Sequence, residues 1–365
     1  MFMAGFATAD TVRVASFNVS LGRKGPGLLL KDIVEGDDQI AALVTVIQTV
    51  RPDILVMQEF DHDDRGLALA AFRDVLAAGA EGIEYPYWFA PAGNEGRPSF
   101  MDLNGDGYEN DWADSLGFGK FPGGEAMAML SRYPIGETHT FADVLWRDVP
   151  EAELPLDADG KAFLSAEVLD ILPMSYRSHW DVAVEIDGEV LHILAAHTAP
   201  PVFDGPENLN GLRNAAEIGF WVHYLDGMEF TDDAGLAAAM ALPFVLVGDY
   251  NNDPNDGEGF KASIRALLGH PLIADPLPMS TGAAVVSGQV NAAQIGNPAL
   301  DTVDWGDEIG NMRVDYVLPS RDLRVEGATV VWPDGGDPFF EAVEEASHHR
   351  MVWVDVNVSS FLRAQ

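Results

Sequence analysis

The sequence predicts a mixed α/β sandwich. Apolar segments of strand length often follow one another without a helix between them, which favours a sandwich over a doubly wound sheet. The 365 residues are 47% hydrophobic, which is enough for a sizeable core. No linker divides the chain convincingly, so we expect a single domain at residues 11–360 behind a tail at residues 1–10.

The first third of the chain predicts strands and helices, followed by a long loop. Apolar residues from Ile40 to Ile47 follow the i, i+3, i+4, i+7 spacing of an amphipathic helix, which ends at Arg51-Pro52-Asp53. Residues 91–124 are rich in Gly, Asp, Asn and Pro, which indicates a functional loop. The other elements expected here are strands at 12–18 and 54–60 and a helix at 66–80.

The rest of the chain predicts mostly strands. Asp187-Gly188 is a typical two-residue hairpin turn. Residues 145–160 are acidic and predict a surface excursion, and residues 271–311 are rich in Pro, Gly and Asn. Strands are expected at 125–130, 162–171, 179–186, 190–197, 244–247, 312–318, 323–332 and 351–358, and helices at 212–225 and 260–268.

The composition excludes several classes of function. Fifty-eight acidic against 21 basic residues leave a net charge of −37, which repels polyanions unless a local patch or bound cations compensate. Adaptation to a salty medium is an alternative reason for such a charge. The absence of cysteine excludes disulfides, thiolate metal sites and cysteine nucleophiles. No apolar run is long enough for a transmembrane helix.

The N-terminus suggests a location. Phe2–Ala9 is apolar or small, and Ala7-Thr8-Ala9 fits a signal-peptide cleavage site, so we expect a periplasmic or secreted protein. The segment lacks a basic start and a full apolar region. A plain N-terminal tail is therefore the alternative.

One stretch joins a buried strand to polar residues. Phe244–Val247 leads into Gly248-Asp249-Tyr250-Asn251. In an extended backbone Asp249 and Asn251 project to the same side, where a carboxylate and a carboxamide suit a hard cation and a reacting oxygen. The same residue types are also typical of an ordinary turn.

Similar polar residues stand at the ends of several other predicted strands. A single such residue is usually a cap or a turn, but several of them predict a shared site. The set comprises Asn18, Glu59, His197, Asp249, Asn251, Asp315 and His348-His349.

These segments resemble the endonuclease/exonuclease/phosphatase superfamily, the DNase I-like metal-dependent phosphoesterases, and residues 200–214 resemble a segment of its secreted bacterial members. The resemblance runs from residue 16 to residue 350 in the family's order, and it implies a four-layer sandwich of two mixed sheets with helices outside. The matching segments are Ser16-Phe17-Asn18, Asp53–Glu59, Met129–Pro134, Ala196-His197-Thr198, Gly248–Asn251, Arg313–Val317 and Ser347–Arg350.

The resemblance also implies a metal site. Glu59 would be the main ligand, with Asn18 beside it. The family ends in Ser-Asp-His, whereas this chain has Ser347-His348-His349, so an imidazole of His348 replaces a carboxylate on the metal side. Oxygen-rich ligands favour Mg²⁺ or Mn²⁺, and the imidazole favours Mn²⁺. A spectator role for His348 and reduced activity are the alternatives.

The catalytic roles follow from the same resemblance. Asp249 and Asn251 would hold the attacking water or the phosphate, and Asp315 would orient His349 as the acid/base residue. His197 would bind a phosphate oxygen or stabilise the transition state. An Asp bonded to one imidazole nitrogen fixes its tautomer and raises its basicity, and such groups contribute ~10²–10⁴ in rate.

Two further features bear on ligands. Asp102, Asn104 and Asp106 occupy the first positions of an EF-hand-like loop, which predicts structural Ca²⁺, although Ala113 stands where the final Glu belongs. A solvated turn is the alternative. His179, Arg213 and Asn214 are candidate substrate contacts, and ordinary strand-end or helix-surface residues are the alternative.

The sequence therefore predicts a monomeric, metal-dependent phosphoesterase that acts on a small or moderately sized phosphoester. Charge disfavours nucleic acid. A secreted nuclease, or a catalytically weak protein that binds calcium or a phosphorylated ligand, are the alternatives.

Overall fold

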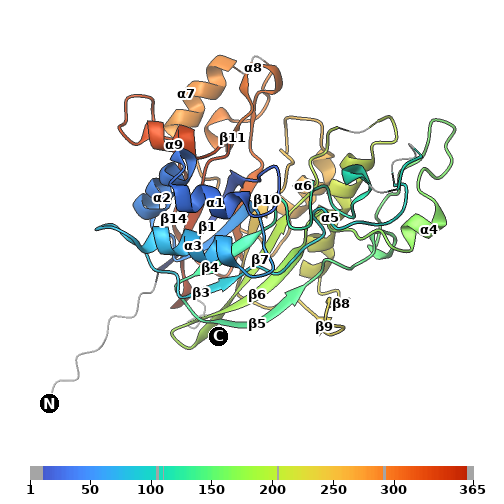
Figure 1. Ribbon diagram of the computed structural model, residues 1–365, viewed down its shortest axis with the longest axis horizontal. Coiled ribbons are helices and arrows are strands. Elements are labelled where there is room, and N and C mark those ends of the chain that lie inside the picture. Colours follow the sequence, from blue (N-terminus) through green and yellow to red (C-terminus); the bar gives the residue numbers. More distant parts are fainter. Residues whose placement is uncertain (1–10, 104–106, 110, 204, 291–292, 360–365) are drawn as a thin grey trace.

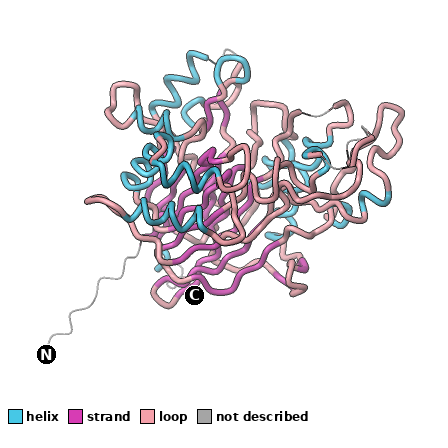
Figure 2. Tube along the Cα trace, in the orientation of Figure 1, coloured by secondary structure: helices cyan, strands magenta, loops and turns pink. Residues whose placement is uncertain are grey.

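The computed structural model describes residues 11–103, 107–109, 111–203, 205–290 and 293–359. These residues form four layers, in which two β-sheets pack face to face between helices (Figure 1). Figure 2 shows the helices gathered mainly on either side of the strands. The predicted four-layer α/β sandwich of two mixed sheets is confirmed. The N-terminal tail, on which the expected location depends, lies outside the described residues.

The first sheet is built around a parallel pair of strands. Its six strands are, in spatial order, β14 (Arg324–Val330), β15 (Val352–Asn357), β1 (Thr11–Leu21), β2 (Ile54–Phe60), β4 (Ala128–Ser131) and β3 (Tyr87–Phe89). The pair β1 and β2 is parallel, and the other neighbours are antiparallel. Because both faces of the sheet are covered, β2 reads as a continuous apolar run rather than an alternating one.

The second sheet repeats this plan. Its five strands are, in spatial order, β13 (Asp315–Pro319), β10 (Phe244–Asp249), β7 (Glu189–His197), β6 (His179–Ile186) and β5 (Ile135–Thr140). Here β7 and β10 are the parallel pair. Two small ribbons lie outside the sheets and consist of β8 (Phe230–Thr231) with β9 (Ala237–Ala238), and β11 (Val303–Asp304) with β12 (Asn311–Met312).

Helices cover the outer face of each sheet. The helices on the first sheet are α1 (Leu28–Glu35), α2 (Asp38–Val50), α3 (Leu67–Ala77) and α9 (Phe340–Ala346). Those on the second sheet are α5 (Leu209–Leu225) and α6 (Lys261–Leu268). The remaining helices are α4 (Ala166–Leu169), α7 (Thr281–Val290) and α8 (Gly306–Ile309).

The strand alternation divides the apolar residues between separate cores. On β1, Val12 and Val14 face the core between the sheets, whereas Ala15 and Phe17 face the helices. Each fully buried side chain of the size of valine or phenylalanine contributes roughly 1.5–3 kcal/mol. The two sheets are therefore held rigidly together, which fixes the strand ends that carry the predicted site.

The structure corrects one predicted strand. Residues 162–171 contain the short helix α4, in which the Ser165 hydroxyl caps the N-terminus by accepting from the Val168 N–H. The local cap and the packing of Val168 into the outer core override the apolar run that suggested a strand. Helices α1, α7 and α9 were not predicted. No helix among the described residues is long and apolar enough to cross a membrane.

Candidate active site

Asp315 and His349 form a buried pair at the edge where the strand ends meet. Asp315 opens β13, and His349 lies between α9 and β15. Nδ1 of His349 donates to Oδ2 of Asp315 at 2.9 Å. Thr302 donates its hydroxyl to the same oxygen at 2.8 Å. The carboxylate therefore fixes the ring and leaves Nε2 of His349 for a substrate or a water molecule.

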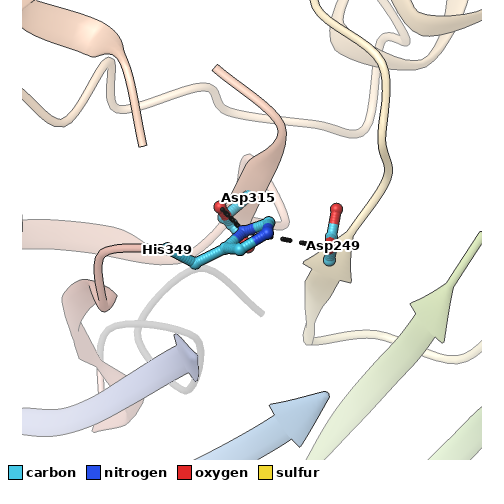
Figure 3. Close-up of side chains that lie close together, drawn as sticks. All are labelled: Asp249, Asp315 and His349. Atoms are coloured by element: carbon cyan, nitrogen blue, oxygen red, sulfur yellow. Dashed lines mark hydrogen bonds and ion pairs between the residues drawn. The ribbon is translucent and has the colours of Figure 1, made fainter. Parts of the chain in front are cut away.

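Asp249 lies beside the His349–Asp315 pair, on the other side of the imidazole ring (Figure 3). Its Oδ2 atom lies 3.8 Å from Nδ1 of His349 and 3.4 Å from Nε2 of His197. The same oxygen accepts from Nδ2 of Asn18 at 3.0 Å. Strand register places Asp249 opposite both His197 and Asp315. The second sheet therefore sets the position of all three residues.

The site residues change one another's protonation. Burial raises the pKa of Asp249 to about 7, although the charge of His349 acts in the opposite direction. Burial lowers the pKa of His349, but Asp315 and Asp249 outweigh this and raise it to about 9. Burial and the charges of Arg177 and His349 hold the pKa of His197 well below its ordinary value. At neutral pH His349 is charged and His197 is neutral.

Comparison with known proteins identifies the family. A sequence model of the Endonuclease/Exonuclease/phosphatase family matches residues 15–353. The chain belongs to this family. A search among curated proteins found no match.

Several solved structures are similar to this chain. The endonuclease/exonuclease/phosphatase from Beutenbergia cavernae DSM 12333 is 19% identical with a TM-score of 0.52, over 95% of this chain and 71% of that chain. A family protein from Leptotrichia buccalis C-1013-b is 14% identical with a TM-score of 0.49, over 94% and 99% of the two chains. Another from Bacteroides thetaiotaomicron is 16% identical with a TM-score of 0.49, over 95% and 97%.

Glu59 brings a further carboxylate to this family site. Its backbone has a φ of 55°, a left-handed conformation that costs a non-glycine residue roughly 1–3 kcal/mol. Its Oε1 accepts from Nδ2 of Asn18 at 3.0 Å. The Ser20 N–H donates to Oδ1 of Asn18, which turns the amide nitrogen toward Glu59 and Asp249. Asn18 therefore bridges two carboxylates as a donor, where the sequence predicted a metal ligand.

The spacing argument for Asp249 and Asn251 is wrong. Asn251 has a φ of 48°, so the backbone is not extended there. Its N–H donates to Oδ1 of Asp249 at 2.9 Å, and its Nδ2 donates to the Thr198 carbonyl at 3.0 Å. Gly248 is required because a Cβ atom would lie 1.9 Å from the Ala196 carbonyl oxygen. This close approach brings Asp249 beside β7.

Two site residues were missed in the sequence. Arg177 precedes β6, and it donates to the backbone carbonyl of Glu125 at 2.7 Å and to its carboxylate at 3.2 Å. The Nη1 atom of Arg177 is buried and has no hydrogen-bond partner among the described residues. Arg177 stands two residues before His179, which the sequence offered as a candidate substrate contact. Glu125 opens a predicted strand. Sequence alternation alone did not indicate which of these residues faces the site.

The donor set fits a hard divalent cation. Asp249, Asp315 and His349 bring possible ligand atoms within 4.8 Å of one another, but the charged ring of His349 cannot bind a cation, which leaves the carboxylate oxygens as ligands. Burial raises the pKa of Glu125, the charge of Arg177 opposes this, and the charge of Glu59 adds to the rise. Two carboxylates that repel each other in this way favour a bound cation. Their oxygen atoms match Mg²⁺ or Mn²⁺, as the sequence predicted.

His348 does not join the buried cluster. Its side chain is exposed, whereas His349 beside it is 6% exposed. The backbone carbonyl of His348 accepts from the Asp304 N–H at 3.0 Å. The metal-ligand role predicted for His348 is therefore corrected, because its imidazole lies in solvent.

The predicted substrate contacts are structural residues. His179 is fully buried, and its ring nitrogens lie 2.8 Å from the Ser175 hydroxyl and 3.1 Å from the Glu217 carbonyl oxygen. Burial lowers its pKa to about 3. Arg213 and Asn214 are buried and bond mainly to backbone carbonyls. Their donors are used inside the protein, so the predicted substrate role is wrong.

The predicted calcium loop is described in part. Oδ2 of Asp102 accepts from the Gly107 N–H at 2.9 Å. Asn104 and Asp106 lie outside the described residues. Structural Ca²⁺ stays a prediction.

Proposed function

We propose that this protein is a metal-dependent hydrolase that cleaves a phosphoester with an attacking water molecule. The observation that carries the proposal is the buried His349–Asp315 pair beside Asp249, which Asn18 connects to Glu59 of the other sheet. Membership of a phosphoesterase family supports the reaction class.

The carboxylates would hold the divalent cation. Glu59 is its proposed ligand, and Glu125 adds negative charge beside Glu59. When bound, the cation would neutralise phosphoryl oxygens and lower the pKa of a water molecule. Asn18 bonds to Glu59 and to Asp249 and so keeps the two carboxylates in a fixed arrangement, with Asp249 left to act on the attacking water.

The pKa values suggest how protons move. Asp249 can accept a proton from the attacking water near neutral pH because burial raises its pKa to about 7. His349 carries a proton at this pH, so its Nε2–H can donate to the phosphoryl group or to the leaving oxygen. Asp315 holds the ring in place and stabilises its charge.

Two further residues suit the phosphoryl oxygens. The buried Nη1 of Arg177 is a charged donor that needs an acceptor. His197 is neutral and carries one N–H, so it can donate to Asp249 or to a substrate oxygen but not to both.

The charge distribution favours a small substrate over a polyanion. Ten of the 21 basic residues, apart from Arg177, are already in ion pairs with carboxylates, which leaves fewer of them to line a phosphate-binding groove. They are Arg13, Arg23, Lys31, Arg97, Arg132, Arg147, Lys161, Arg313, Arg324 and Arg350.

A substrate and metal panel tests the proposal. Metal-free protein is assayed with Mg²⁺, Mn²⁺ or Ca²⁺ against a phosphomonoester, a phosphodiester, a phospholipid head-group substrate and plasmid DNA. We expect turnover of a small ester with Mg²⁺ or Mn²⁺, and its loss in EDTA.

The matched variants are Glu59→Gln and Glu185→Gln. Glu185 is an exposed carboxylate on β6 and serves as the control. Glu59→Gln should lose metal-stimulated turnover, whereas Glu185→Gln should keep it. Turnover of no substrate would overturn the proposal, and phosphate or Ca²⁺ binding without turnover would instead identify a binding protein. Plasmid nicking in preference to small esters, lost in Glu59→Gln, would identify a nuclease.

A further inference from the structure

We propose that Glu217 of α5 is a positioning residue, which holds the ends of β6 and β7 together so that Arg177 and His197 face the same phosphoryl group. The inference rests on the proposed function, because the phosphoryl-binding role of those two residues comes from it. Glu217 itself does not touch the reacting atoms.

Both oxygens of the Glu217 carboxylate are bonded to strand ends. Oε1 accepts from the Tyr176 N–H at 2.7 Å, and Oε2 accepts from the Ala199 N–H at 2.7 Å. Tyr176 directly precedes Arg177, and Ala199 follows His197 by two residues. A single carboxylate therefore connects the two backbone segments that carry the phosphoryl-binding side chains.

The bonding pattern requires a carboxylate rather than another side chain. Glu217 is fully buried, and placing a carboxylate there is costly in water-free surroundings. Burial raises its pKa to about 7, against the opposing charge of Arg213. A glutamine would offer one acceptor oxygen and would place its amide N–H₂ against the other backbone N–H. The two backbone N–H donors, one for each oxygen, offset the cost of removing the carboxylate from water.

The helix that carries Glu217 is itself anchored to the same segments. Arg213 donates to the carbonyls that precede β6, and Asn214 donates to the carbonyls of Ala199 and Tyr250, which follow β7 and β10. These bonds fix α5 relative to the three strand ends. Glu217 then supplies the acceptors that the N–H groups of two of those ends need.

Asp181 provides a matched control in the same layer. It is 2% exposed, and its carboxylate accepts from the Tyr224 hydroxyl at 2.6 Å and lies 2.7 Å from Nδ1 of His192. Like Glu217, it joins α5 to β6 and β7 through buried hydrogen bonds. It lies within β6, opposite Leu194, and does not hold a strand end. Asp181→Asn should therefore lower stability without displacing Arg177.

Turnover of a phosphodiester with Mn²⁺ provides the first test. We expect Glu217→Gln to lower kcat about 10–100-fold, because small displacements of binding groups have effects of this size. Asp181→Asn should retain kcat at a similar loss of Tm. In a protein that already carries Arg177→Met, Glu217→Gln should lower kcat less than about threefold, because the effects of substituting coupled residues are not additive. Full additivity, or an equal loss in Asp181→Asn, would overturn the proposal.

Hydrogen exchange provides a test that does not depend on activity. Peptides that contain the Tyr176 and Ala199 amides should exchange faster in Glu217→Gln than in Asp181→Asn, and unchanged exchange contradicts the proposal. If Glu217→Gln does not fold, Glu217→Asp serves instead, because it keeps the charge but is too short to reach both amides.

A protein without any phosphoester turnover would refute the proposed function separately. In that case calorimetry with inorganic phosphate and Mn²⁺ decides the positioning role. We expect phosphate to bind about tenfold more weakly to Glu217→Gln than to Asp181→Asn. Equal binding by the two variants would overturn the role.

Discussion

His349 and His179 are both buried histidines, yet their surroundings give them opposite charges. His349 is bonded to Asp315 and lies near Asp249, and its pKa rises to about 9. His179 lies between a hydroxyl and a backbone carbonyl, and burial lowers its pKa to about 3. Burial is therefore common to both, and the neighbouring carboxylates alone give His349 the raised pKa that suits the proposed proton-transfer role.

The same contrast separates two regions of the protein. At the catalytic edge, Glu59, Glu125 and Asn251 adopt left-handed backbone conformations, and the buried Nη1 of Arg177 has no partner among the described residues. In the layer formed by α5, the donors of Arg213 and Asn214 bond to backbone carbonyls. An unpaired buried guanidinium donor favours a ligand-binding role for the first region, whereas the bonded donors of Arg213 and Asn214 indicate a supporting role for theirs.

Replacing each of the two histidines by glutamine should give the largest difference in kcat between two variants. His349→Gln should lower kcat by ~10²–10⁴, because the variant loses its acid/base group. His179→Gln should lower the free energy of unfolding by roughly 1–3 kcal/mol through disturbed buried hydrogen bonds, with a much smaller change in kcat. Kinetics and thermal unfolding of both variants measure this. A larger loss of kcat in His179→Gln would break the comparison.

The two buried arginines should differ in the same way. Arg177→Met should reduce kcat/KM by ~10²–10³, since it removes a donor proposed to face the phosphoryl group. Arg213→Met should instead destabilise the fold by about 3 kcal/mol or more, because several buried carbonyls lose their donor. Urea unfolding and steady-state kinetics distinguish them. Equal kinetic effects in folded variants would show that both arginines only support the fold.

The sequence predicted the layers and most strands because buried strands carry long apolar runs and hairpins carry their own turn residues. It also predicted the cluster around Asp249, Asp315 and His349, through motifs at strand ends. It failed where tertiary contacts decide. His179 stands at a strand end like His197, but its ring packs against Phe220 and Trp221 instead of facing the site.

Arg177 and Glu125 show the opposite failure. Neither stands in a recognised motif, and their roles arise from one contact between segments 52 residues apart in the chain. Glu59 and Asn251 adopt conformations that ordinary propensities disfavour, so spacing rules for extended backbone did not apply to them. Local patterns therefore located the site, but the side chains that complete it depend on long-range packing.

The pH dependence of stability should sharpen the contrast further. In metal-free protein the folded-state pKa of His349 is about 9, above its unfolded value of roughly 6.5. Its contribution is therefore fully present below pH ~6.5 and is lost as the pH rises to ~9. The raised pKa of Asp249 acts in the same direction between pH ~4 and ~7.

Thermal unfolding in EDTA between pH 6 and 9 measures this effect. We expect Tm to fall with pH in the wild type and to fall less in His349→Gln. Subtracting one Tm–pH curve from the other cancels the charge repulsion that both proteins share because of the net charge of −37. Parallel curves for the two proteins would contradict the assigned protonation of His349.

Thr302→Val should give the smallest effect, and it tests how far the catalytic edge depends on its supports. The Thr302 hydroxyl donates to Asp315 and accepts from the backbone N–H of Val314 and Asp315. Its loss should cost about 1–2 kcal/mol of stability. Asp315 then has one donor fewer and attracts the His349 proton more strongly. The pKa of His349 should therefore rise, and the pH profile of kcat should shift to higher pH. Thr329→Val, which removes an exposed hydroxyl–carbonyl bond, is the control. An unchanged pH profile of kcat would show that the charge of His349 alone compensates the charge of Asp315, without help from the Thr302 hydroxyl.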